Sequence, residues 1–144
     1  MEQIYTIPVN EVFEKCMAQS VRENVSDCRC PFCELYNKYE ADEVDLILGA
    51  SMMEPDIRKK TNEKGFCRDH FDMMLAYSKR LPLALILESH LDEVRAKVRS
   101  GSFFARKNAS DNVKRLGKLE QSCYICERLN YNFDRSVECA VMLW

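Results

Sequence analysis

Glycine and proline are scarce in this chain, which has four of each in 144 residues. Runs of β-branched residues are also few. Because glycine and proline form most tight turns and β-branched residues favour strands, this composition favours helices. We therefore predict an all-α fold, a small helical protein.

Long apolar runs and a targeting leader are absent as well. No apolar stretch approaches the roughly 20 residues that a membrane-spanning helix needs. The segment Met1–Ile4 has neither the basic nor the apolar region of a signal peptide. The net charge is only −2, so no overall field attracts nucleic acid or an anionic membrane. We expect a cytoplasmic protein that binds neither nucleic acid nor membranes.

Recognisable catalytic patterns are also missing. We find no nucleophile–base–orienter set, no glycine-rich phosphate loop and no paired carboxylates in an obvious cleft. We therefore name no catalytic residue, and the sequence favours a protein that is not an enzyme.

Cysteine, in contrast, is abundant, with eight in the chain. In a protein without a secretion signal, so many cysteines indicate reduced thiols and metal binding rather than a disulfide framework. The clearest pattern is Cys30-Pro31-Phe32-Cys33, then 33 residues, then Cys67-Arg68-Asp69-His70. Two pairs at two-residue spacing supply three thiolates and one imidazole, which is a full tetrahedral set for zinc.

We therefore predict a Cys3His zinc clasp that joins helix N-termini, with Cys30, Cys33, Cys67 and His70 as ligands. Pro31 suits the first position of a helix, so Cys33 should lie in that helix's first turn. The alternative is that these four are ordinary buried residues.

Three other residues are further candidates. Cys28 could replace Cys30 as a ligand. Cys16 lies on an apolar helical stripe, so we expect it to pack in the core. His90 lies in mid-helix among leucines, so we expect a core histidine and not a ligand.

The chain divides, on this interpretation, into three parts. Residues 1–99 form a zinc-stapled helical unit, after a short extended lead-in at residues 3–8. Residues 100–112 are polar around Ser100-Gly101-Ser102 and are predicted to be a linker. Residues 113–144 begin a second, incomplete repeat, a CxxC pair plus a helix.

The repeat rests on an offset of 93 residues, which aligns Cys30 with Cys123 and Cys33 with Cys126. A complete repeat would carry partners of Cys67 downstream of residue 144, so we expect a chain cut short inside its second repeat. Cys123 and Cys126 are then a second metal or redox pair without a partner in the chain.

The predicted C-terminal helix carries an apolar stripe that this interpretation leaves uncovered, formed by Ile125, Leu129, Phe133, Val137 and Val141. We expect residues 124–144 to bind a second copy of the chain or another protein. In a dimer, Cys123 and Cys126 of both chains could share a metal. The alternative is that the stripe folds onto residues 82–99, leaving a monomer.

A basic segment precedes this helix. Between Arg95 and Lys118 there are eight Lys and Arg against one acid, Asp111. A solvated face is the simple interpretation, and a site for an acidic partner is the alternative.

Four motifs together resemble an uncharacterised bacterial family of anaerobic Gram-positive organisms, a domain of unknown function. They are Ile4-Tyr5-Thr6-Ile7-Pro8-Val9-Asn10, Cys30-Pro31-Phe32-Cys33, Gly65-Phe66-Cys67-Arg68-Asp69-His70 and Ser122-Cys123-Tyr124-Ile125-Cys126. Members of that family continue into a second Gly-Phe-Cys-x-x-His-like motif, which is absent here. The resemblance implies the metal ligands and a cytosolic location, but no substrate.

We therefore predict a zinc-binding helical protein that serves as a protein-interaction or regulatory module. The alternative is a redox or iron–sulfur protein that uses its CxxC pairs, with a cluster in place of zinc.

Overall fold

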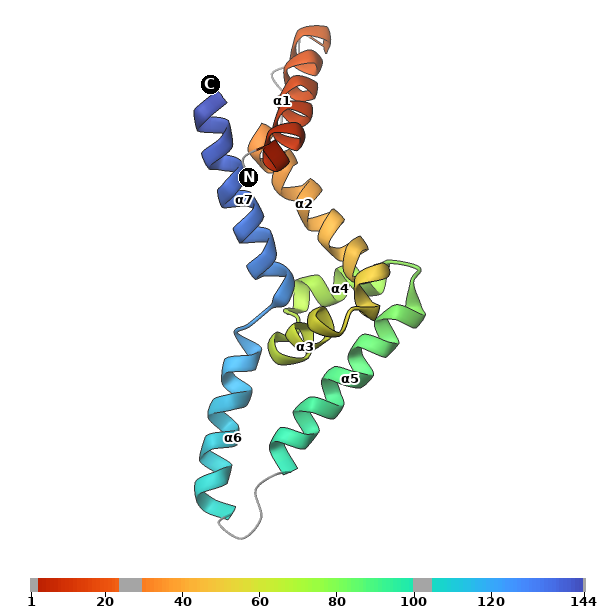
Figure 1. Cartoon of the computed structure of the whole chain (residues 1–144), viewed down its shortest axis with the longest axis vertical. Helices are drawn as coiled ribbons and strands as arrows, with labels where there is room; N and C mark the ends of the chain where they lie inside the picture. The colour runs from red at the N-terminus through yellow and green to blue at the C-terminus, as the bar shows by residue number, and fades with distance from the viewer. Residues whose placement is uncertain (1–2, 24–29, 100–104, 144) are drawn as a thin grey trace. The chain divides into compact units, whose positions relative to one another are not determined.

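The computed structural model describes residues 3–23, 30–99 and 105–143, and these residues form helices joined by short connections (Figure 1). The side chains of residues 19–23, 99 and 105–109 are not described. The helices, in chain order, are α1 (Gln3–Glu23), α2 (Pro31–Ile47), the 3-10 helix η1 (Ala50–Met53), α3 (Pro55–Lys64), α4 (Arg68–Ala76), α5 (Arg80–Arg99), α6 (Ala105–Glu120) and α7 (Tyr124–Leu143). The predicted all-α class is confirmed.

The chain forms two units. Unit 1 consists of Met1–Glu43 and Glu127–Trp144, and unit 2 consists of Val44–Cys126. This division differs from the predicted one, because unit 1 combines segments from both ends of the sequence. Of the predicted linker, residues 105–112 begin α6, while residues 100–104 lie outside the described part of the chain.

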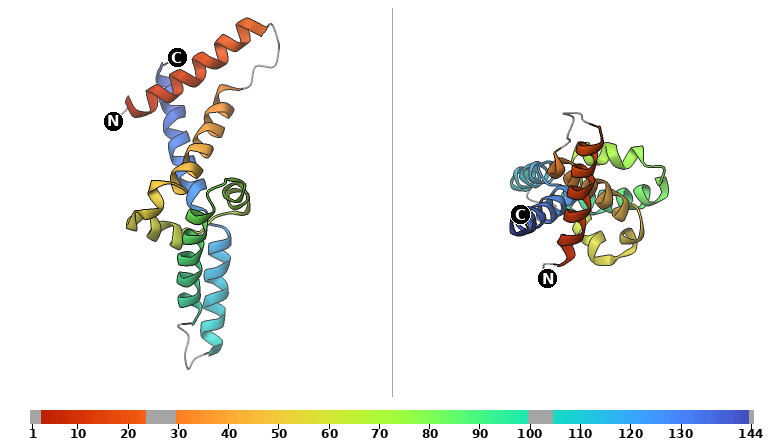
Figure 2. Two further views of the ribbon diagram at one scale, coloured as in Figure 1. Left: turned by 90° about the vertical axis from the view of Figure 1, so that its right-hand side faces the viewer. Right: turned by 90° about the horizontal axis from the view of Figure 1, so that it is seen from above.

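Unit 1 is built from α1, most of α2 and most of α7, and α1 lies across the other two helices (Figure 2). Its core combines residues from all three helices, and these are Val9, Val12, Phe13, Cys16, Leu35 and Ala140. Cys16 is 7% exposed in this core, as predicted.

The predicted extended lead-in at residues 3–8 is wrong, because these residues open α1 with Pro8 inside the helix. Proline removes the hydrogen bond to the carbonyl four residues earlier. That carbonyl belongs to Ile4, which is 73% exposed, so water can satisfy it.

The apolar stripe on α7 is mostly covered within unit 1. Leu129 is fully buried, and the Phe133 ring makes edge contacts with Phe32 at 6.4 Å and Tyr36 at 5.3 Å. Val141 remains 74% exposed. The ring of Phe133 is covered by α2, whereas Ile125 packs with Leu83 and Ile86 in the core of unit 2. Association through residues 124–144 stays a prediction.

Unit 2 contains η1, α3 to α6, and the ends of α2 and α7. Helices α5 and α6 form a hairpin that is open at one end and closes toward the other (Figure 1), where the Asn112 amide donates to the Val98 carbonyl at 3.2 Å. The main apolar core of unit 2 consists of Val44, Ile47, Leu48, Met74, Leu83, Ile86, Cys123, Tyr124 and Ile125. Residues that precede the hairpin in the sequence and residues that follow it both belong to this core. Residues 122–126 therefore lie next to the beginning of α4.

Candidate metal centre

Two hydrogen bonds join the segment before α4 to the segment before α7. The Tyr124 N–H donates to the Gly65 carbonyl at 3.0 Å. The Ser122 hydroxyl donates to the Lys64 carbonyl at 2.7 Å. These bonds place the first turns of α4 and α7 next to each other, and each of those turns carries a pair of metal-ligating side chains.

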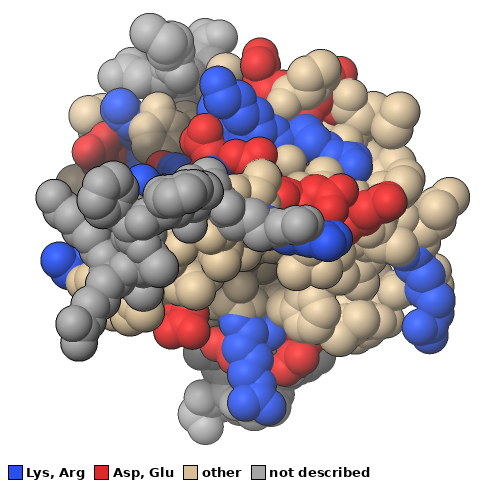
Figure 3. Space-filling view, turned by 90° about the horizontal axis from the view of Figure 1, so that it is seen from below, with Lys and Arg blue, Asp and Glu red and all other residues tan. Residues whose placement is uncertain are grey.

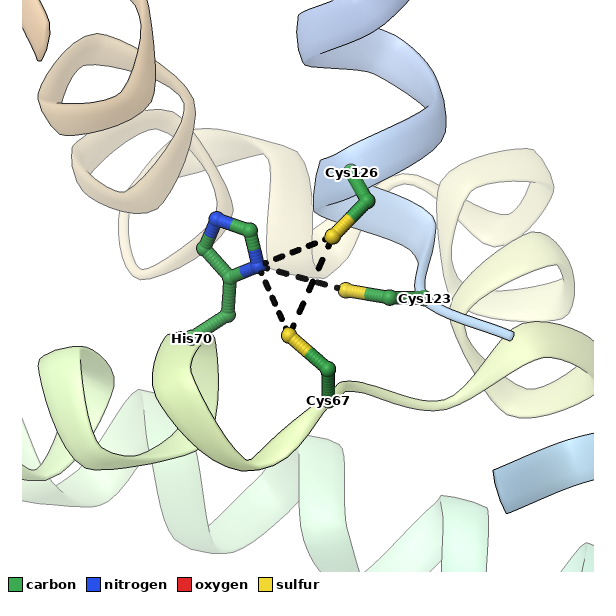
Figure 4. A group of neighbouring side chains, drawn as sticks. All are labelled: Cys67, His70, Cys123 and Cys126. Carbon is green, nitrogen blue, oxygen red and sulfur yellow. Dashed lines mark hydrogen bonds between the residues drawn. The ribbon is translucent and has the colours of Figure 1, made fainter. Parts of the chain in front are cut away.

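The pairs are Cys67 with His70 and Cys123 with Cys126 (Figure 4). The His70 Nδ1 atom lies 3.1 Å from the Cys67 sulfur and 3.4 Å from each of the Cys123 and Cys126 sulfurs. The Cys67 and Cys126 sulfurs are 3.8 Å apart. All four ligand atoms lie within 4.8 Å of one another.

These spacings fit a tetrahedral zinc ion. Zinc–sulfur bonds of about 2.3 Å and zinc–nitrogen bonds of about 2.0–2.1 Å imply sulfur–sulfur edges of about 3.8 Å and sulfur–nitrogen edges of about 3.6 Å. The four edges given above are within about half an ångström of these values, and the other two are at most 4.8 Å. Four protein ligands also leave no open position for water, which is typical of a structural site rather than a catalytic one.

The cluster is sheltered from water. His70 and Cys123 are 3% and 8% exposed, and Cys67 and Cys126 are partly buried. Burial, and then the neighbouring Cys123 and Cys67 thiols, raise the pKa of Cys126 to about 12. A bound divalent cation reverses this effect, because a coordinating thiol loses its proton.

The structure brings together two of the four predicted ligands. Cys67 and His70 lie together, but their partners in the cluster are Cys123 and Cys126. Cys30 and Cys33 lie in unit 1, at the start of α2, and both are exposed. Cys28 lies outside the described residues. The sequence alone does not reveal this grouping, because the two pairs are more than 50 residues apart. The α5–α6 hairpin lies between them and brings them together.

His90 lies near the metal-ligating cluster but contacts other residues. Its Nδ1 atom donates to the Asn62 carbonyl at 3.0 Å, and its ring packs against Gly65. His90 is half-buried and is not part of the metal-ligating group found among the described residues.

Gly65 has backbone angles that strongly favour glycine. Its φ is 62° and its ψ is −157°, and a Cβ atom there would lie 3.1 Å from the His90 ring. We expect Gly65→Ala to lower the free energy of unfolding by about 1–3 kcal/mol. The matched control is Gly117→Ala, since a Cβ at Gly117 meets nothing within 4 Å and alanine favours a helix. Urea denaturation should show a loss at the first position only. Equal effects would contradict the claim.

A groove in unit 2 lies between α5, α6 and the end of α3, with a volume of about 570 Å³. Its apolar lining consists of Val94, Val98, Leu116 and Leu119. Its cations are Lys64, Lys97, Arg115 and Lys118, against one acid, Glu63. Positive and negative side chains are interspersed over the face shown in Figure 3.

None of the described helices is both long enough and apolar enough to cross a membrane. No curated protein matches this sequence, and no solved structure matches it either. The model of one protein family matches residues 1–144, which is the whole chain. The chain therefore belongs to the family of unknown function DUF6062.

Proposed function

We propose that the protein is a zinc-stabilised helical interaction protein, in which Cys67, His70, Cys123 and Cys126 hold one structural zinc ion. The observation that carries the proposal is the cluster itself, whose four ligand atoms lie within 4.8 Å of one another. A zinc ion there would link the first turn of α4 to the first turn of α7.

The ligand chemistry favours zinc over an iron–sulfur cluster. Three thiolates and one imidazole are a common structural zinc set, whereas most iron–sulfur clusters use four cysteines. Visible absorption distinguishes the two, because an iron–sulfur cluster is coloured and zinc is not.

Metal analysis of protein purified without oxygen tests the site. We expect one zinc ion per chain, a large loss of zinc in His70→Ala and no loss in His90→Gln. The second histidine is a matched control, since its ring nitrogen is already bonded to the Asn62 carbonyl. Zinc retained in His70→Ala, or lost only in His90→Gln, would contradict the proposed ligand set.

The groove between α5 and α6 supports the interaction role. Val98 and Leu116 are 40% and 39% exposed there, and cations surround them. An apolar floor with a positive rim is complementary to an amphipathic helix with acidic flanks. We propose that the partner carries such a helix.

A fluorescent acidic amphipathic peptide serves as the probe. Anisotropy should show salt-sensitive binding that weakens at least about tenfold in Arg115→Glu, which corresponds to about 1.4 kcal/mol. Lys15→Glu, an exposed charge reversal on α1, should leave binding unchanged. If no acidic peptide binds, or if both variants bind alike, the proposed groove is not the docking site.

A further inference from the structure

The exposed pair Cys30 and Cys33 takes no part in the proposed zinc site. Both side chains lie at the surface of unit 1. Among the described residues, no group of three or more metal-ligating side chains includes either cysteine. Two exposed thiols in a CxxC spacing therefore need a separate explanation.

The backbone holds the two thiols in a defined arrangement. The Glu34 N–H donates to the Cys30 carbonyl at 3.0 Å, so Cys30 occupies the N-cap of α2 and Pro31 the first helical position. Cys33 then follows within the first turn, one helical turn after Cys30. This spacing places the two α-carbons about 5–6 Å apart, within the range that a disulfide spans.

The turn between the cysteines is anchored by its apolar residue. The Phe32 ring packs edge-on against Phe13 at 5.1 Å and against Phe133 at 6.4 Å. Phe32 thus faces the interior of unit 1 while its neighbours Cys30 and Cys33 face solvent. With Phe32 packed in this way, both cysteine sulfurs are exposed to solvent, and neither has to move out of the core to react.

The two sulfurs also differ electrostatically. The backbone N–H groups of Cys33 and Phe32, followed by the Cys33 thiol, lower the pKa of Cys30. The Cys33 pKa is raised, first by its hydrogen bond to Cys30 and then by the charge of Cys30. One sulfur is therefore suited to attack as a thiolate, and the other remains a thiol beside it.

We propose that Cys30 and Cys33 form a thiol–disulfide exchange site that reduces a disulfide presented at the protein surface. The Cys30 thiolate attacks one sulfur of the substrate disulfide, whose bond breaks, and the departing thiolate takes up a proton. Cys33 then loses its proton and attacks the Cys30 sulfur, which releases the second substrate thiol. The two cysteines are oxidised to a disulfide, and the substrate disulfide is reduced to two thiols.

The substrate class is a disulfide, which could be small or part of a protein. Oxidised glutathione and a disulfide-linked peptide are the two probes that separate these sources. The zinc-loaded protein is used for both, in a Cys28→Ser background, so that Cys30 has one resolving partner. Zinc content is measured in parallel, and this keeps failure of the exchange site distinct from failure of the proposed zinc site.

In the Cys28→Ser protein, peptide mapping should find a Cys30–Cys33 disulfide, lighter by two hydrogens, and no lasting mixed disulfide. Cys33→Ser added to this background should trap the probe on Cys30. Cys30→Ser should trap less on Cys33, since that thiol lacks the two backbone N–H bonds that lower the pKa of Cys30. Cys16, buried in the same unit, is an internal control that should not react.

Wild-type protein gives a second measurement that needs no substitution at the pair. Iodoacetamide at neutral pH should label Cys30 faster than Cys33. Equal labelling, or a stable mixed disulfide in place of the internal one, would overturn the proposal. So would a zinc content of about 1.5 per chain that Cys30→Ser reduces to one, because two copies of the chain would then share a metal through these pairs.

Discussion

Replacing Cys123 with serine should remove the zinc ion and much of the folded structure of unit 2. Serine is a poor zinc ligand, and the site would retain only three of its four ligands. Structural zinc in small peptides contributes on the order of 10–16 kcal/mol of apparent binding free energy at pH 7. This is comparable to the 5–15 kcal/mol that separates most folded domains from their unfolded chains, so losing a large part of it can unfold the domain.

We expect Cys123→Ser to contain little zinc and to unfold at a much lower temperature, with loss of helical circular dichroism. Cys30→Ser is the matched control, because Cys30 also belongs to a CxxC pair but is exposed and outside the cluster. It should keep its zinc and its melting temperature. If Cys30→Ser loses the metal and Cys123→Ser retains it, the ligand set predicted from the sequence is right and the present assignment is not.

Replacing Arg128 with methionine should have the largest effect on unit 1. Glu43 is a charged residue only 5% exposed, and one of its carboxylate oxygens accepts a hydrogen bond from Arg128 Nε at 2.8 Å. The other oxygen accepts one from the Asn132 amide at 3.0 Å. Without the guanidinium group, a buried carboxylate would lack its countercharge.

We expect Arg128→Met to cost about 1.5–3 kcal/mol in the free energy of unfolding, because the Glu43 side chain is only 7% exposed although the Arg128 side chain is 44% exposed. Lys38→Met is the control, because the Lys38–Asp42 pair is exposed and such pairs contribute at most about 1 kcal/mol. The double variant Glu43→Met, Arg128→Met should recover most of the loss, since it buries no charge. Urea denaturation measures all three. An Arg128→Met loss no larger than that of Lys38→Met would contradict this account.

Local signals in the sequence were enough to locate several helix boundaries. Pro31 opens α2, as predicted, and a glycine, Gly65, ends α3 with a positive φ. Cys67 and His70 were also recognisable as a pair, because both lie at the start of α4. Each of these features depends on residues close together in the chain.

The remaining errors have physical causes. Residues 105–112 are polar and were predicted to be a linker, yet they form the start of α6, a largely exposed helix in which few apolar residues are needed. The partners of Cys67 lie more than 50 residues later in the chain, beyond the α5–α6 hairpin. Three cysteine-containing pairs can be combined into a tetrahedral set in more than one way, and only the fold selects among them.

The separation of the two ligand pairs also has a consequence for synthesis of the protein. His70 precedes Cys123 by 53 residues. At about 5–20 residues per second, a ribosome adds that stretch in roughly 3–10 s. During this interval, the zinc ligands available in the emerging chain are Cys67 and His70. The nearest additional thiolates are those of Cys30 and Cys33. If the proposed zinc ion binds at this site, its final capture follows translation of α6, and an ion bound earlier would have to change ligands before the chain reaches its native state.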